Sequence, residues 1–144
     1  MIRVIFVLTA IAIGVTGVVA QGDAISERKA LMKKNAQHTK GINAMIKGEA
    51  PFDAAAVNAA FTQWAGTAAQ LPKLFPDNSK SGGDTRALPK IWEDRAGFNA
   101  QVAAFAKAAA AKPADLEALK KAFPAVGKAC GDCHESYRAA AKKK

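Results

Sequence analysis

The chain of 144 residues lacks the patterns on which most enzyme active sites are built. It shows no Ser/His/Asp set, no pair of carboxylates suited to acid–base chemistry and no glycine-rich phosphate loop. Cysteine is scarce as well: Cys130 and Cys133 are the only two, which leaves nothing for a disulfide framework. The sequence therefore does not predict an enzyme, and its distinctive chemistry is concentrated where these two cysteines lie.

Strand signals are also missing. The chain after residue 20 is rich in alanine, has few runs of β-branched residues, and repeats apolar residues three or four apart. This spacing predicts helices over residues 23–47, 53–71, 89–111 and 113–138, the second capped by Asp53 and the last kinked or broken at Pro124. Four amphipathic helices with mostly short connections predict an all-α, antiparallel four-helix bundle, whose core can house a cofactor.

The two cysteines lie in the run Cys130-Gly131-Asp132-Cys133-His134, a C-x-x-C-H pattern typical of haem c attachment. Thiols three residues apart on one helical face can each add across one vinyl group of a single haem, and the next histidine can reach the iron. The alternative is a thioredoxin-like redox pair, which would open a helix in a βαβ setting, and no strand pattern supports it. We expect one covalently bound haem c per chain, attached through Cys130 and Cys133, with His134 as an iron ligand.

The N-terminus predicts export. A basic start, Met1-Ile2-Arg3, precedes an uncharged run over residues 4–19, and Val18 and Ala20 are small residues suited to cleavage after residue 20. The alternative is a retained membrane anchor, but the run is shorter than the roughly 18–20 apolar residues that span a bilayer comfortably. We expect residues 1–20 to be a cleaved signal peptide and residues 21–144 to form one domain in the bacterial periplasm.

Acidic residues are outnumbered, 12 against 21 basic ones, and the formal net charge is +9 at pH 7. Removal of Arg3 with the signal peptide lowers it by one. The lysines are dispersed and no nucleic-acid-binding motif accompanies them, so nucleic acid is not the expected partner. The charge favours docking on an acidic surface of a redox partner. Lys128, Arg138 and the terminal Lys142-Lys143-Lys144 form either a docking patch or a solvated chain end.

The order of these features resembles one family. A C-terminal C-x-x-C-H motif behind three helices is similar to the class II cytochromes c, the cytochrome c′ and cytochrome c-556 family. The resemblance implies a four-helix bundle with the haem between helices and one edge open to solvent, often assembled as a homodimer. Further matches follow in order along the chain: Arg28 four residues before Met32, Lys47-Gly48-Glu49-Ala50-Pro51-Phe52-Asp53-Ala54-Ala55, Pro89-Lys90-Ile91-Trp92 with Phe98, Val126-Gly127-Lys128-Ala129, and Tyr137-Arg138.

The family divides on the sixth coordination position of the iron. Members of the c-556 type are low-spin, with a methionine from the first helix on the iron. Members of the c′ type leave the position empty under a hydrophobic residue, and they bind nitric oxide or carbon monoxide. The resemblance places this distal residue at Met32 and implies axial ligation by His134 and Met32. Two alternatives stay open: an unbound methionine over a five-coordinate iron, and an ordinary core methionine that fills a gap.

Three further residues near this position carry expectations. By resemblance, Arg28 lies beside the haem and neutralises a propionate, which a guanidinium can bind through two hydrogen bonds. The alternative for Arg28 is a surface ion pair with Glu27 or Glu49. His38 falls on another face of the same helix and is expected to be solvated. The family pattern implies that Trp92 or its neighbours border the haem pocket.

These features predict a periplasmic monohaem c-type cytochrome that carries electrons through a low-spin iron held by His134 and Met32. The alternative is a five-coordinate, high-spin cytochrome c′ that binds nitric oxide or carbon monoxide. An enzyme such as a peroxidase would need an open iron beside a distal acid–base residue, and Arg28 alone does not supply one.

Overall fold

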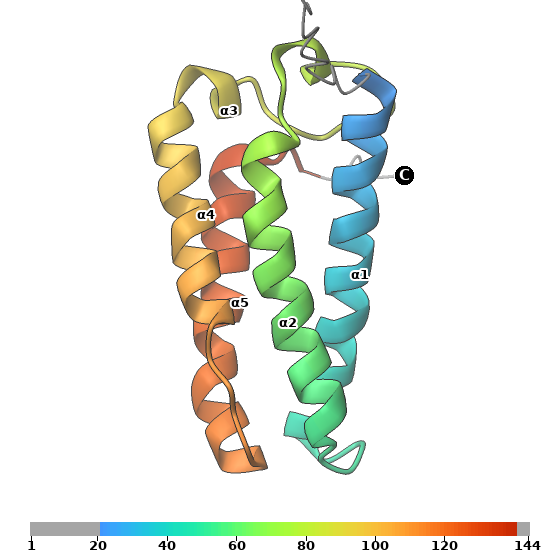
Figure 1. Ribbon diagram of the computed structural model, residues 1–144, viewed down its shortest axis with the longest axis vertical. Helices are drawn as coiled ribbons and strands as arrows, with labels where there is room; N and C mark the ends of the chain where they lie inside the picture. Colours follow the sequence, from blue (N-terminus) through green and yellow to red (C-terminus); the bar gives the residue numbers. More distant parts are fainter. Residues whose placement is uncertain (1–20, 141–144) are drawn as a thin grey trace, which may run out of the picture.

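The computed structural model describes residues 21–140, so the predicted signal peptide, residues 1–20, lies outside the described residues. Four long helices form the bundle: α1 (Gln21–Lys47), α2 (Ala54–Gln70), α4 (Arg95–Ala109) and α5 (Leu116–Tyr137). They run alternately down and up (Figure 1), which confirms the predicted antiparallel four-helix bundle. Over residues 21–140, no helix is long and apolar enough to cross a membrane.

The first helix ends and the second begins where the sequence predicts. α1 ends at Lys47 because Gly48 adopts φ +75°, a left-handed conformation that turns the chain. The backbone N–H of Glu49 then donates to the carbonyl of Ala44 at 2.9 Å, as is common at helix ends. Asp53 caps α2, since its carboxylate accepts two backbone N–H groups of the first turn at 2.9 and 3.1 Å.

The predicted helix over residues 89–111 is wrong as a single element. The long connection after α2 contains the turns η1 (Leu71–Lys73) and η2 (Asp77–Ser79), followed by a short helix α3 (Lys90–Glu93). The chain leaves the helical conformation at Asp94, with φ −120° and ψ 63°. The Asp94 carboxylate caps α4 by accepting the Gly97 N–H at 2.9 Å and also accepts the Tyr137 hydroxyl at 2.9 Å. A capping residue therefore overrides the apolar periodicity at this point.

The fourth helix also differs from its prediction in two respects. It does not begin at Pro113, because Asp115 caps it and the helix starts at the next residue. It does not break at Pro124, which lies inside a continuous helix on its exposed side. Leu119 and Val126, 0% and 1% exposed, bury the helix on both sides of Pro124. This packing outweighs the backbone hydrogen bond that a proline cannot donate.

Two groups of aromatic residues pack in the bundle interior. Trp64, with 0% exposure, packs against Phe61 and Phe123, with ring centroids 5.0 and 5.9 Å away. Phe98 contacts Phe75 and Tyr137 near the end of the bundle where the long connection lies, at 4.9 and 5.6 Å. By contrast, α1 and α5 touch at few positions. The bundle is therefore well packed except between these two helices.

Candidate haem-binding site

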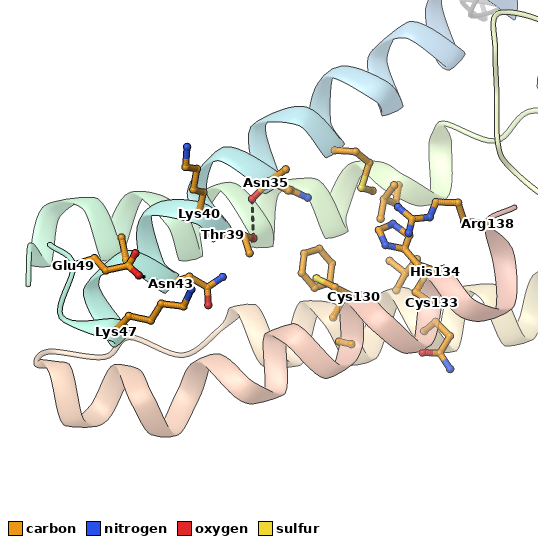
Figure 2. A pocket seen from close by; sticks show the side chains of 18 residues that line it. Asn35, Thr39, Lys40, Asn43, Lys47, Glu49, Cys130, Cys133, His134 and Arg138 are labelled. Carbon is orange, nitrogen blue, oxygen red and sulfur yellow. Dashed lines mark hydrogen bonds and ion pairs between the residues drawn. The ribbon is translucent and has the colours of Figure 1, made fainter. Parts of the chain in front are cut away.

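The space between α1 and α5 contains two adjoining cavities. The larger, of about 800 Å³, is bounded by α1, α4 and α5 and is open at one side (Figure 2). The smaller, of about 330 Å³, lies toward the long connection and is lined in part by Phe75, Ile91 and Phe98. The two cavities share five lining residues, which therefore stand where the spaces meet: Met32, Leu71, Cys133, His134 and Arg138.

Helix α5 presents the C-x-x-C-H motif to this space. Residues three and four apart lie on one helical face, and Cys130, Cys133 and His134 all line the larger cavity. Both cysteines are free and half-buried, and burial raises the pKa of each thiol. Burial lowers the pKa of His134, helped by the positive charges of Arg138 and Arg86. At neutral pH the site therefore presents protonated thiols and a neutral imidazole with a free lone pair.

Helix α1 forms the opposite wall and carries Met32. Met32 is half-buried and lines both cavities, as His134 does from α5. Met45 is 7% exposed, belongs to the hydrophobic core and lines neither cavity. Within residues 21–140, Met32 is thus the one methionine whose side chain borders the same space as His134. Ile25 and Ile42, on the same helix, are buried at 3% and 1% exposure.

A set of hydrogen-bonded polar side chains lies one helical turn from Met32. Asn35 is 9% exposed and lines the larger cavity. Its side-chain oxygen accepts the hydroxyl of Thr67 at 3.0 Å, and Thr67 in turn accepts the Gln63 amide at 3.1 Å. The Thr39 hydroxyl donates to the Asn35 backbone carbonyl at 2.9 Å (Figure 2). These bonds fix Asn35 at the cavity wall. Its three-residue spacing from Met32 predicts this face of α1, but the sequence does not indicate its partner Thr67.

Arg28 serves as a clamp for the long connection. Its guanidinium is buried, at 5% exposure, and its Nη groups donate to the Leu74 carbonyl, to the hydroxyl and carbonyl of Ser79, and to the Thr85 hydroxyl, at 3.0, 2.9, 3.0 and 2.6 Å. Burial lowers the pKa of this guanidinium. The surface ion pair considered for Arg28 is therefore not formed. Four of its five N–H donors are occupied by the connection, which leaves only Nε–H for any other acceptor.

Two other expectations concern His38 and Trp92. His38 is half-buried in a groove between α1 and α2, away from the cavities that His134 lines. It is therefore not placed to act as a second axial histidine. Trp92 lines neither cavity, and its indole N–H donates to the carbonyl of Phe75 at 3.0 Å. Its neighbour Ile91 does line the smaller cavity, as the resemblance implied for this segment.

The comparison with known proteins agrees with this geometry. Residues 23–138 match the family described as Cytochrome C'. The chain belongs to the cytochrome c′ family. It is 42% identical over 145 residues to cytochrome c-556 of Rhodopseudomonas palustris, covering 96% of this chain and 97% of the relative. It is 43% identical over 141 residues to cytochrome c′ of the same organism, with the same coverage.

Solved structures give the same result. Cytochrome c′ from Rhodopseudomonas palustris superposes with a TM-score of 0.78 at 45% identity, over 84% of this chain and 98% of that one. An NMR-validated structural model of oxidised cytochrome c556 from that organism superposes with a TM-score of 0.75 at 43% identity, over 83% of this chain and 98% of that one. A nitric oxide complex of a mutant cytochrome c′ from Alcaligenes xylosoxidans superposes with a TM-score of 0.73 at 31% identity, over 85% of this chain and 98% of that one. Both types of the family are thus matched about equally well.

Haem c, which the family carries covalently, fits the site of this cytochrome. The larger cavity is mostly apolar and opens to one side, which suits a flat macrocycle with one exposed edge. Two thiols on one face of α5 can anchor it, and an imidazole and a thioether reach the same space from two helices. Histidine and methionine are both known axial donors to haem iron in c-type cytochromes.

Replacing Arg28 with Met should release the long connection from α1. Hydrogen bonds to a charged group contribute roughly 1.5–3 kcal/mol each when lost singly, and losses within one network do not add fully. We expect the free energy of unfolding of the holoprotein to fall by about 2–4 kcal/mol, and amide hydrogen exchange over residues 71–88 to accelerate.

The matched control is Lys29→Met on the next residue. Lys29 is exposed and donates one hydrogen bond, to the Gly83 carbonyl at 3.1 Å. Its replacement should change stability by less than about 0.5 kcal/mol. If Arg28→Met leaves both stability and exchange as in the control, Arg28 does not clamp the connection.

Proposed function

We propose that this cytochrome is a low-spin electron carrier in which His134 and Met32 are the axial ligands of the haem iron. The observation that carries the proposal is that Met32 on α1 and His134 on α5 border both cavities from opposite helices. When bound, haem supplies an iron centre that takes up and releases one electron. A thioether ligand favours the ferrous state and raises the reduction potential relative to nitrogen ligands alone.

The helices that carry the two ligands are well suited to hold them still. Leu31 beside Met32 and Tyr137, three residues after His134, are buried at 8% and 5% exposure, so each helix is anchored in the core close to its ligand. A fixed pair of ligands limits the rearrangement of the protein between oxidation states. This favours electron transfer over bond-making chemistry. The fixed polar group near Met32 is the amide of Asn35 rather than an ionisable acid–base residue, so we propose no enzymatic role.

The attachment we propose joins the sulfur atoms of Cys130 and Cys133 to the two haem vinyl groups after export. Each thiol S–H adds across one C=C bond, so the haem is bound without loss of a leaving group. The intact mass of protein expressed in a periplasm with haem-attachment machinery should equal residues 21–144 plus one haem. Cys130→Ala and Cys133→Ala should each retain at most one thioether. A product that keeps Met1, or one without haem mass, would contradict the export or the attachment proposal respectively.

We propose that the partner is a redox protein with an acidic docking surface, because this chain is strongly basic. The Debye length shrinks from about 30 Å at 0.01 M salt to about 8 Å at 0.15 M. The second-order rate of electron transfer to an acidic redox protein, measured by stopped flow, should therefore fall several-fold over this range. Transfer to a neutral small-molecule oxidant should change little. Equal salt responses for the two oxidants would remove the case for electrostatic docking.

The second candidate is a gas-binding, five-coordinate cytochrome c′. Two observations favour it: Met32 is only half-buried, beside cavity space on both sides, and the similar solved structures include a nitric oxide complex. In this case Met32 would act as a steric gate over the distal face of the haem rather than as a ligand.

The variant Met32→Ala separates the two candidates. If the Met32 sulfur is a ligand, its removal must convert a low-spin absorption spectrum into a high-spin one and speed carbon monoxide binding to the ferrous protein at least tenfold. Met45→Leu is the matched control, since Met45 lies in the core away from both cavities, and it should leave the spectrum low-spin. A wild-type protein that is already high-spin at neutral pH would refute ligation and support the gas-binding candidate.

A further inference from the structure

The chain that follows α5 returns along the long connection and brings two arginines to the smaller cavity. Ala87 and Arg138 form an isolated antiparallel bridge, and the Ala139 N–H donates to the Arg86 carbonyl at 2.8 Å. The Arg86 Nε–H donates to the Ala139 carbonyl at 3.1 Å. These bonds fix the backbone on both sides, and the side chains of Arg86 and Arg138 both line the smaller cavity.

The residues that line the smaller cavity include more positively charged than negatively charged side chains. Arg28, Lys29, Arg86 and Arg138 line it with a single carboxylate, that of Asp84. Arg28 is occupied by the connection and Lys29 bonds a carbonyl. None of the ion pairs formed within residues 21–140 involves Arg86 or Arg138. Two guanidinium groups that form no ion pair within residues 21–140, beside a half-buried imidazole, make a site that favours an anion.

The opposite end of the larger cavity also has cations, but their charge is already partly balanced. Lys40 and Lys47 line that end together with Glu49 (Figure 2). Lys47 and Glu49 form an ion pair at 3.9 Å. Arg138, by contrast, extends beside His134 at the junction of the two cavities (Figure 2). Within residues 21–140, the arginine end is therefore the one whose cations outnumber its carboxylates without forming an ion pair.

We propose that Arg86 and Arg138 form the binding site for a propionate carboxylate of the haem, at the end of the cavity near the long connection. The inference rests on the proposed attachment of haem through Cys130 and Cys133, next to this end. In this proposal the propionate is bound by two arginines, Arg86 and Arg138. Arg28, which the resemblance suggested for this role, instead holds the connection in place. Arg28 then supports the site indirectly, because it fixes the connection on which Arg86 lies.

The test is resonance Raman spectroscopy of the holoprotein with Arg86→Gln, Arg138→Gln and the double variant. Both side chains are exposed at the surface, so their replacement removes little core packing. The propionate bending bands should shift to lower frequency in each variant and furthest in the double variant, and the midpoint potential should fall with them. Lys40→Gln and Lys47→Gln at the opposite end are matched controls and should leave the bands unchanged. Arg86→Lys should recover part of the shift in potential.

Two results would overturn the proposal. One is a set of propionate bands that places the carboxylate elsewhere: the double variant matches the wild type, or a control variant at the opposite end shifts instead. The other is a saturable response of the wild-type potential to phosphate at constant ionic strength that disappears in the double variant, which would assign the arginines to a free anion. The spin-state bands of the same spectra report on Met32 separately. A high-spin wild type would therefore refute its ligation without deciding the role of the arginines.

Discussion

The sparse contact between α1 and α5 is the constraint on which the rest of the structure depends. Two antiparallel helices of a bundle normally pack side chain against side chain, but here a mostly apolar cavity of about 800 Å³ separates them. An open apolar cavity of this size loses the dispersion contacts that a packed core would have. A covalently held haem would restore these contacts, with His134 and Met32 facing the same space from the two helices.

The two ends of α5 are secured in different ways, and this difference positions the site. Leu119 anchors its first half in the core. Its last turn is held by Tyr137, whose hydroxyl bonds the Asp94 carboxylate that caps α4. The fit is close, because a Cβ added at Gly97 would lie 2.6 Å from that hydroxyl. The haem motif thus lies on a helix fixed at both ends, while the connection above it is fixed separately by Arg28.

The sequence predicts the bundle and the haem-attachment motif better than it predicts the contacts between distant residues that hold the helices in place. Gly48 and Asp53 mark the end of α1 and the start of α2 correctly, because each depends on local backbone chemistry. The C-x-x-C-H run identifies its own helical face for the same reason. The break at Asp94 is supported by its bond to Tyr137, and the continuity through Pro124 is supported by the burial of Leu119 and Val126 in the core. Contacts between distant segments decide both points, and periodicity carries no information about them.

The role of Arg28 illustrates the same limit. Its spacing from Met32 indicates the correct face of α1, but its partners Leu74, Ser79 and Thr85 come from a connection without regular periodicity. Likewise, Arg86 and Arg138 line the same cavity because residues 138 and 139 pair with this connection. Residues whose role depends on a loop therefore become visible only in three dimensions, and these residues surround the charged end of the cavity.

The most direct test of the central claim is an NMR spectrum of the reduced holoprotein with its methionine methyl groups labelled with carbon-13. If residues 1–20 are removed as we propose, Met32 and Met45 are the two methionines that remain. If the Met32 sulfur binds the iron, one methyl resonance must move far upfield of the usual methionine range, because the ring current of the porphyrin acts directly on it. The Met45 methyl should remain near its ordinary position. If neither methyl shows this displacement, Met32 is not the sixth ligand.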